Sequence, residues 1–306
     1  MKIMVFDVGG TEIKYSVMDE QMHRTDSGAV PTPQDTQAQF LDAVYRLYAP
    51  HKDEVSGIAM ALPGFVDNRT GYVSNGGALL YNTATPVGQL LAEKCGCPVI
   101  LENDGKAAAM AELANGALKG CCNAAVFIIG TGVGGGIIAN GQLVRGVHFT
   151  AGEYSFVNTN AEAWDAPDQN MACQCSTKNL LKWYRARKAL PEDAPLNGRS
   201  FFAAANAGEP EALEVLRRFC HAVAVQIFNL TVLLDVEKVA IGGGISKQPL
   251  LLESLRSAYD GLYASRAGQA YMEGLPRCQI VPCAFSSEAN QVGVAAAYFE
   301  AMQKKC

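Results

Sequence analysis

A hairpin with a glycine-rich turn occurs twice in this sequence, and it is the feature that most constrains the fold. The side chains of residues 2–7 alternate as in a β-strand. The glycine-rich turn Asp7-Val8-Gly9-Gly10-Thr11 follows and leads into a second predicted strand at residues 13–18. The pattern begins again at Ala124, with a strand through Ile129, a turn at residues 130–136 and a strand from Ile137. The sequence therefore suggests an internal duplication and predicts two α/β lobes of related topology.

The other elements follow from hydrophobic spacing. We expect helices at residues 35–49, 105–118, 209–234, 249–263 and 289–302, and buried strands at residues 55–62, 99–101, 238–241 and 279–281. Asp104 directly precedes one of these helices and is expected to cap it. No low-complexity linker separates the halves, so the repeat places the lobe boundary near residues 103–119. One lobe is expected to comprise 1–104 plus 289–306 and the other 105–288.

Composition narrows the possible partners. A chain of 306 residues with 49% hydrophobic and 18% charged residues can build two lobes, and its net charge of −5 argues against nucleic acid as a partner. The apolar stretch before Asp7 is too short for a signal peptide, and the apolar stretch 124–139 is interrupted by five glycines. We therefore expect a cytoplasmic protein that has no membrane partner.

Ten cysteines raise the question of disulfides or a metal. The chain is large, lacks a signal sequence and carries the adjacent pair Cys121-Cys122, so free and mostly buried thiols are the better interpretation. Only Cys173-Gln174-Cys175 has a spacing suggestive of a metal.

The first glycine turn combines the groups that a triphosphate needs. Gly9 and Gly10 let backbone N–H groups approach an anion, Thr11 adds a hydroxyl, Lys14 a cation, and Asp7 a carboxylate able to hold water around Mg²⁺. Such a turn alone is structural more often than functional. A second turn at the equivalent place strengthens the case for a polyphosphate, and no P-loop sequence is present.

A third glycine cluster, Gly242-Gly243-Gly244, ends a predicted strand before a helix. Backbone at this position can pack flat against a nucleotide, although alone it would be interpreted as a tight turn.

Glu102-Asn103-Asp104 supplies a candidate base. Asp104 lies at the end of a strand and the start of a helix, whose dipole favours the ionised carboxylate. It could accept a hydroxyl proton while Mg²⁺ and the glycine-turn amides stabilise charge on a transferred phosphoryl group. An isolated Asp before a helix is usually only a cap, but capping and catalysis can coexist.

Together these motifs resemble the ROK family of sugar kinases and related repressors, over almost the whole chain. The matching segments are Asp7-x-Gly9-Gly10-Thr11-x-x-Lys14, Pro63-Gly64, Glu102-Asn103-Asp104, residues 130–136, Gly141 to Gly146, Ala151-Gly152-Glu153 and Gly242-Gly243-Gly244-Ile245-Ser246. The resemblance implies an actin-like (ribonuclease H-like) ATPase fold with two related lobes around a cleft. It also implies transfer of the γ-phosphoryl group of ATP to a sugar hydroxyl, usually on carbon 6, with Mg²⁺, and a homodimer.

The same resemblance assigns roles to residues. Asp104 is the base, and Asp7 also holds Mg²⁺ through water. The sugar is held by Gly64, Asn103, Asp104 and Glu153. The nucleotide is lined by Asp7, Gly9, Gly10, Thr11, Lys14, Thr131, Gly132, Gly134, Gly243 and Gly244.

The sequence departs from the family at a zinc motif. Many ROK members have a His three residues after the Glu equivalent to Glu153, then Cys-x-Cys-Gly-x-x-Gly-Cys-x-Glu, and bind structural zinc through that His and three Cys. Here Phe156 stands at the His, Leu180 at the third Cys and Lys182 at the final Glu. Two ligands of four cannot make a closed site, so no structural zinc is expected. A rearranged site with His148 or another Cys stays open as an alternative.

These departures also bear on the substrate. In zinc-bearing members the His and the final Glu contact the sugar near its anomeric end, and Phe156 and Lys182 cannot reproduce those contacts. We expect 6-phosphorylation of a glucose-like sugar or β-glucoside, with a glucokinase or N-acetylmannosamine kinase as alternatives. A repressor would carry a DNA-binding segment before the first turn, where only six residues precede Asp7. A non-catalytic, sugar-sensing regulatory ROK protein is the alternative from another class.

Overall fold

The computed structural model describes residues 1–266 and 268–303, which form two compact units. The first unit contains Met1–Asn115, Leu143–Ala151 and the described residues from Ser287 onward, and the second contains Gly116–Gln142 and Gly152–Ser286. The lobe boundaries expected from the repeat, 1–104 with 289–306 and 105–288, stay a prediction.

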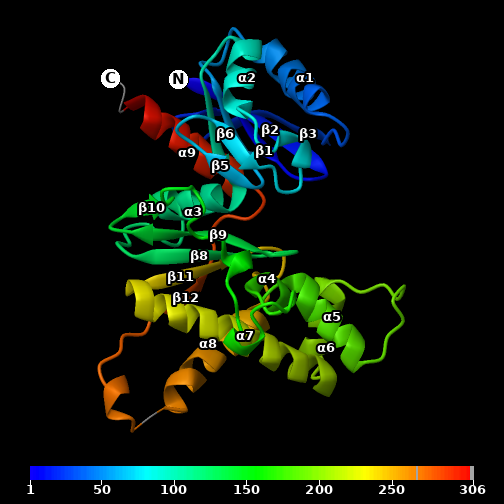
Figure 1. Ribbon diagram of the computed structural model, residues 1–306, viewed down its shortest axis with the longest axis vertical. Coiled ribbons are helices and arrows are strands. Elements are labelled where there is room, and N and C mark those ends of the chain that lie inside the picture. Colours follow the sequence, from blue (N-terminus) through cyan, green and yellow to red (C-terminus); the bar gives the residue numbers. More distant parts are fainter. Residues whose placement is uncertain (267, 304–306) are drawn as a thin grey trace. The chain divides into compact units, whose positions relative to one another are not determined.

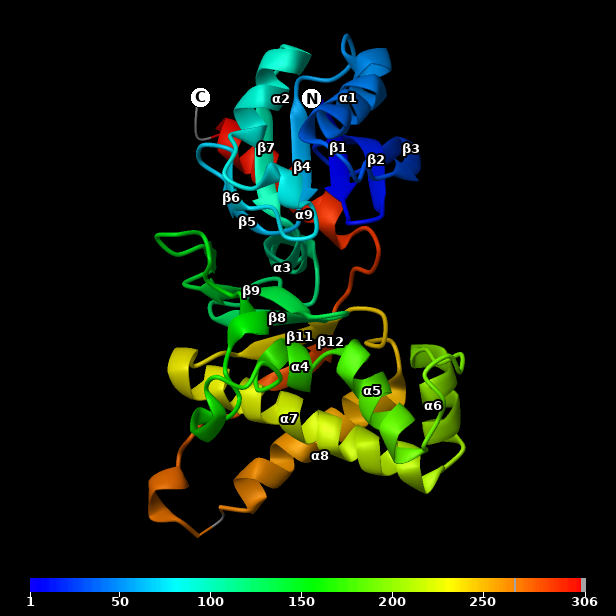
Figure 2. The same ribbon diagram turned by 45° about the vertical axis from the view of Figure 1, so that its right-hand side comes forward.

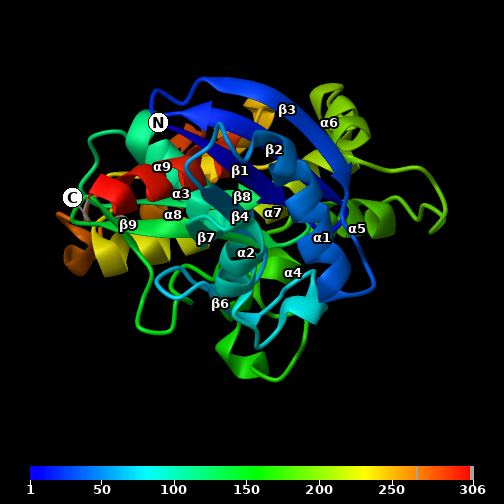
Figure 3. The ribbon, with the colours of Figure 1, turned by 90° about the horizontal axis from the view of Figure 1, so that it is seen from above.

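The first unit is built on a five-stranded sheet in the order β3-β2-β1-β4-β7, which can be followed in Figure 3. The first glycine turn joins β1 and β2 as an antiparallel hairpin, whereas β1, β4 and β7 run parallel. A small hairpin, β5-β6, follows β4. The strands are β1 (Lys2–Val8), β2 (Glu12–Asp19), β3 (Arg24–Pro31), β4 (Ile58–Leu62), β5 (Phe65–Asp67), β6 (Tyr72–Asn75) and β7 (Val99–Asn103).

Helices cover both faces of this sheet (Figures 1 and 2). On one face, Phe40 and Val44 of α1 (Gln37–Tyr48) and Leu91 of α2 (Val87–Cys95) share a buried core with alternate strand residues such as Met4 and Phe6. On the other face, α9 (Ala289–Gln303) packs against β1, β4 and β7 and beside α3 (Asp104–Asn115). The two-residue period of the strands therefore assigns their side chains to two different layers.

The second unit repeats this sheet topology. Its order is β10-β9-β8-β11-β12, with β8 antiparallel to β9 and β8, β11 and β12 parallel. Position by position this is the order of the first sheet, as the internal duplication predicts. The strands are β8 (Ala124–Ile129), β9 (Val133–Ala139), β10 (Gln142–Val144), β11 (Lys238–Gly242) and β12 (Gln279–Pro282).

Two long helices supply a large part of the core of the second unit. Phe219 and Val223 of α7 (Pro210–Leu234) and Leu251 of α8 (Pro249–Ala264) are buried with strand residues such as Phe127 and Ile241. Helices α4 (Met171–Gln174), α5 (Thr177–Arg187) and α6 (Gly198–Asn206) pack against α7, as Figure 2 shows for α5 and α6. Short 3₁₀ helices are η1 (Ala49–His51), η2 (Leu80–Asn82), η3 (Tyr154–Phe156), η4 (Ala161–Ala163) and η5 (Ala270–Met272).

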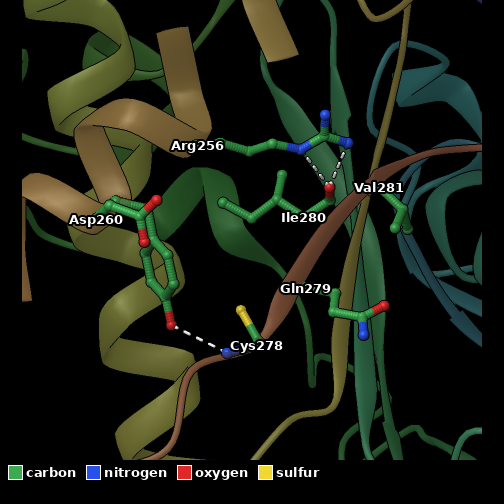
Figure 4. A pocket seen from close by; sticks show the side chains of 7 residues that line it. Arg256, Asp260, Cys278, Gln279, Ile280 and Val281 are labelled. Atoms are coloured by element: carbon green, nitrogen blue, oxygen red, sulfur yellow. Dashed lines mark hydrogen bonds between the residues drawn. The ribbon is translucent and has the colours of Figure 1, made fainter. Parts of the chain in front are cut away.

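One outer strand of the second sheet, β12, is protected by two side chains of α8. Nε and Nη2 of Arg256 donate to the carbonyl oxygen of Ile280 at 2.9 and 2.8 Å (Figure 4). Tyr259 of the same helix accepts the N–H of Cys278 at 3.3 Å. These contacts occupy main-chain groups of β12 and of the residue before it, which on a bare edge could pair with another chain.

The nine described cysteines are free thiols. Cys121, Cys175, Cys220 and Cys278 are buried, and Cys122 is the exposed one among the nine. Among the described residues, no helix combines the length and the apolar character needed to cross a membrane.

The crossing of α3 and α9 predicts a steric test of the first unit. A Cβ built on Gly293 would lie 1.7 Å from the carbonyl oxygen of Ala107, whereas one built on Gly261 of α8 would meet nothing within 4 Å. Gly293→Ala should therefore lower the free energy of unfolding by about 1–3 kcal/mol, because the helices must separate. Gly261→Ala should leave it unchanged or raise it by about 1 kcal/mol. Urea unfolding followed by circular dichroism compares the two, and equal midpoints would contradict the close crossing.

Candidate functional site

Three parallel strands of the first unit end at the same edge. The register pairs Asp7 of β1 with Ala61 of β4, and Ala61 with Glu102 of β7. The next residues along the chain are the glycine turn after β1, Pro63-Gly64 after β4 and Asp104 after β7. The carboxyl edge of the sheet thus gathers the predicted residues of this unit, as is usual for sites in open α/β sheets.

Asp7 is a half-buried carboxylate with two compensating neighbours. Asn290 of α9 donates from Nδ2 to Oδ1 of Asp7 at 2.9 Å, and Lys14 is its partner across the β1-β2 hairpin. Burial raises the pKa of Asp7, while the Asn290 hydrogen bond and the Lys14 charge act in the opposite direction. An oxygen ligand in this setting fits a magnesium ion bound through water. No sequence pattern indicated Asn290.

The first glycine turn is fixed by contacts to its carbonyl oxygens. Thr32 donates from Oγ1 to the oxygen of Gly9 at 2.8 Å and from its N–H to the oxygen of Thr11 at 3.0 Å. Gln34 donates from Nε2 to the oxygen of Gly10 at 2.7 Å. These bonds restrict the backbone of the turn, which favours a preorganised anion site.

Asn103, and not Asp104, caps α3. Oδ1 of Asn103 accepts the N–H of Lys106 at 3.0 Å, the bond of an N-cap, and the helix begins at Asp104. The prediction that Asp104 caps this helix was therefore wrong by one residue. Oδ1 of Asp104 instead accepts the N–H of Gly105 at 2.8 Å and a hydrogen bond from Nδ2 of Asn103 at 3.1 Å.

Asn103 also forms a hydrogen bond with the turn after β4. Its Nδ2 donates to the carbonyl oxygen of Gly64 at 2.9 Å. Gly64 has a φ of +93°, and a Cβ there would lie 2.0 Å from the carbonyl oxygen of Asn75. Only glycine fits this position, so Gly64 and Asn103 form one rigid contact beside Asp104.

Glu102 carries a second buried charge at this edge. Its side chain has no exposed surface, and Nη2 and Nε of Arg145 each lie 2.8 Å from its Oε2. Burial raises the pKa of Glu102, and the Arg145 charge opposes that shift. Arg145 lies within the Gly141 to Gly146 segment of the family resemblance, but its partner could not be read from the sequence.

In the second unit, two glycine turns pack together at the ends of β8 and β11. Gly243 has a φ of +97°, and a Cβ there would lie 2.2 Å from the carbonyl oxygen of Ile129. The carbonyl oxygen of Gly130 accepts the N–H of Thr177, at the start of α5, at 2.9 Å. Backbone can therefore approach a ligand closely at this edge. Thr131, Gly243 and Gly244 are exposed there, and Gly134 lies within β9.

Glu153 follows Gly152 and directly precedes η3. This short helix is fixed to the same hairpin, because Tyr154 donates from its hydroxyl to the carbonyl oxygen of Gly136 at 3.0 Å and Ser155 accepts the N–H of Val133 at 3.0 Å. Glu153 is thus held next to the second glycine turn.

The structure brings the predicted residues together in two groups, one in each unit. The first unit contains Asp7, Gly9, Gly10, Thr11, Lys14, Gly64, Asn103 and Asp104, and the second contains Thr131, Gly132, Gly134, Glu153, Gly243 and Gly244. The glycines and hydroxyls of both groups suit phosphate, and the carboxylates and amides suit hydroxyl groups.

The segment at the family's zinc motif is held by hydrogen bonds. Asn170 caps α4 by accepting the N–H of Cys173 at 3.0 Å and donates to the carbonyl oxygen of Pro167 at 3.0 Å. Asn158 and Asn170 form a backbone bridge. Burial raises the pKa of Cys175 to about 12, which disfavours the thiolate that zinc requires. Across residues 1–266 and 268–303, no group of three or more His, Cys, Asp or Glu could hold a metal.

Comparison with known proteins identifies the family. The family model described as ROK family matches residues 3–303. The chain belongs to the ROK family. A relative named beta-glucoside kinase, from Listeria innocua, is 30% identical over 258 residues, which cover 84% of this chain and 87% of the relative.

Solved ROK structures extend the comparison to the fold. A ROK family protein from Streptococcus pneumoniae in complex with sucrose has a TM-score of 0.87 at 28% identity, covering 99% of this chain and all of that one. A ROK family glucokinase from Streptomyces griseus in complex with glucose and AMPPNP has a TM-score of 0.78 at 25% identity, covering 97% and 99%. The predicted family and actin-like fold are therefore confirmed.

The hydrogen-bonded segment predicts that this ROK protein needs no zinc. The purified protein should contain far less than one zinc per chain, and a strong chelator should leave its Tm unchanged. Cys173→Ser should also leave the Tm unchanged, whereas Asn170→Ala should cost about 1 kcal/mol of stability through loss of the cap. Elemental analysis and thermal unfolding measure both effects. One zinc per chain together with chelator-induced unfolding would reject this prediction.

Proposed function

We propose that this chain is an ATP-dependent sugar kinase in which Asp104 is the general base. The observation that carries the assignment is that Asn103 and Asp104 have different roles at the start of α3. Asn103 makes the N-cap bond to the N–H of Lys106, so Asp104 is the first residue of the helix and not its cap. It lies in the first turn, where the helix dipole favours its ionised form, beside the rigid contact of Asn103 with Gly64.

The chemistry proceeds as an in-line displacement. The sugar hydroxyl oxygen bonds to the γ-phosphorus of ATP, the bond from that phosphorus to the bridging oxygen breaks, and ADP leaves with that oxygen. The hydroxyl proton passes to the carboxylate of Asp104. Asn103 contributes mainly by orientation. Its Nδ2 already donates to Gly64 and Asp104 and its Oδ1 accepts from Lys106, which leaves one lone pair for a sugar hydroxyl.

The nucleotide is assigned to the glycine turns of the two units. Backbone amides around Gly9, Gly10 and Thr11, with Lys14, would bind phosphate oxygens, and Asp7 would hold Mg²⁺ through water. When bound, the metal offsets negative charge on the phosphates. From the second unit, the proposed nucleotide residues are Thr131, Gly132, Gly134, Gly243 and Gly244.

For the acceptor we propose the 6-hydroxyl of a glucose-like sugar whose anomeric position is substituted, as in a β-glucoside. Phe156 stands where zinc-bearing relatives have a His, and it is 71% exposed. An aromatic ring offers a stacking surface in place of a polar partner for a free anomeric hydroxyl. A relative named beta-glucoside kinase and a structural neighbour in complex with sucrose support this choice. Free glucose is the main alternative, supported by the glucokinase neighbour.

Glu153 is the proposed sugar contact of the second unit.

We also propose that the protein acts in the cytoplasm as a homodimer, with no nucleic-acid or membrane partner. The alternative from another class is a non-catalytic sugar sensor. Release of ADP on addition of a sugar separates an enzyme from such a sensor in a single assay.

Asp104→Asn tests the base. The amide keeps the shape and a hydrogen bond but cannot take the proton, so kcat should fall roughly 10²- to 10⁴-fold while the fold and most sugar binding remain. Asp53→Asn, at an exposed position, is the matched control and should keep normal turnover. Coupled measurement of ADP release gives kcat, and near-normal turnover of Asp104→Asn would demote Asp104 to a structural residue.

The acceptor is tested by kcat/KM for glucose, N-acetylmannosamine, cellobiose and methyl β-glucoside. We expect one of the glycosides to be preferred, and we expect Phe156→His to shift the preference roughly tenfold toward the free sugar, because it restores a polar partner. Trp164→His, at another exposed aromatic of the same unit, should leave the ratio unchanged. Preference for a free monosaccharide with no turnover of either glycoside would contradict the proposal of a substituted anomeric position, and the kinase assignment would still hold.

A further inference from the structure

Arg145 and Glu102 form an ion pair that the proposed chemistry does not use. Nε and Nη2 of Arg145 each lie 2.8 Å from Oε2 of Glu102, whose side chain is fully buried. Both charges lose water in such a pair, so a buried ion pair is by itself weak evidence for a role in stability. Its place in the chain indicates a different role.

On one side, the pair holds a segment that leads to Glu153. Arg145 lies in Leu143–Ala151, which belongs to the first unit although the chain before and after it belongs to the second. The segment is closed on itself, because the N–H of Ala151 donates to the carbonyl oxygen of Arg145 at 3.1 Å. Gly152 and Glu153 follow directly. A contact that fixes Arg145 therefore fixes the start of the proposed sugar-binding motif.

On the other side, the same carboxylate holds the backbone that leads to the proposed base. Oε1 of Glu102 accepts the N–H of Asn103 at 3.1 Å, and Oε2 also lies 3.4 Å from Nδ2 of Asn68. Asn103 caps α3 and Asp104 begins it. One carboxylate thus contacts both the strand end before Asp104 and the segment before Glu153.

We propose that Arg145 is a positioning residue for phosphoryl transfer, which it serves by anchoring the segment before Glu153 and the backbone before Asp104 to Glu102. This inference rests on the proposed function. The planar guanidinium is essential to it, because two N–H groups hold Oε2 in a fixed direction. A lysine would keep the positive charge but lose that fork.

Arg145→Lys separates positioning from simple charge compensation. The matched control is Arg187→Lys, since Arg187 donates from Nε to Oε2 of Glu214 at the same 2.8 Å, but with both side chains about half exposed. We expect Arg145→Lys to remain folded and to lose roughly 10- to 100-fold in kcat/KM for the sugar, with KM for ATP unchanged. Amide exchange measured by mass spectrometry should become faster at residues 102–104 and 145–153. Arg187→Lys should match wild type within about twofold.

Wild-type sugar kinetics and wild-type amide exchange in Arg145→Lys would overturn the proposal. A merely structural role would lower kcat only in proportion to the folded fraction and leave KM for the sugar unchanged, which also overturns it. If Arg145→Lys does not fold, the double variant Glu102→Gln with Arg145→Met removes both charges, and it should fold with the same loss of kcat/KM. If wild type phosphorylates no sugar, the proposed function fails. The exchange measurement then decides the anchoring alone, with faster exchange in both segments supporting it and unchanged exchange overturning it.

Discussion

The candidate site of the first unit depends on the parallel alignment of β1, β4 and β7. Parallel strands in register bring their carboxyl ends to one edge, and each strand must turn there. The three turns carry the glycines around Gly9, the Gly64 contact and the Asn103 cap. A shift of one residue in the register of β7 would turn Glu102 to the opposite face and displace Asp104. The hydrophobic alternation that seals the sheet therefore also sets the geometry of its functional edge.

Two carboxylates at this edge are withdrawn from water, Glu102 fully and Asp7 in part, and both have partners from distant parts of the chain. Burial raises the pKa of Asp7 and of Glu102, and each shift is opposed by a nearby hydrogen-bond donor or charge. Asp7 obtains its partner from α9 through Asn290, and Glu102 from the returning segment through Arg145. Buried charges of this kind weaken a core unless they are paired, and clusters of them are typical of functional sites.

Local patterns predicted much of the fold. The long helices α7 and α8 agree with the predicted 209–234 and 249–263 to within one residue, because their apolar periodicity is strong. Strand β3 had no such signal, since its residues are mostly exposed and half of them are polar, and β10 has only three residues. The cap of α3 was misassigned because Asn103 and Asp104 are both good capping residues, and only the backbone decides between them.

Local sequence patterns indicated some of the functional residues but not the distant residues that contact them. Motif spacing was enough to indicate Asp7, Asp104 and the glycines, because their chemistry depends on local turns. The partners Asn290 and Arg145 are 283 and 43 residues away from the groups that they contact. A single sequence carries no record of such pairings, since they arise only when the chain folds.

The exposure of Cys122 has a practical consequence. Cys122 lies just after α3, where the chain has passed from the first unit into the second, and it is the exposed thiol among the nine described cysteines. Its N–H donates to the carboxylate of Glu237 at 2.6 Å, so the backbone beneath the thiol is held firmly. A maleimide dye should therefore attach there far faster than at the buried thiols of the native protein. Among the described cysteines, it would give a labelling site in the second unit, seven residues after the chain leaves the first, without any engineered cysteine.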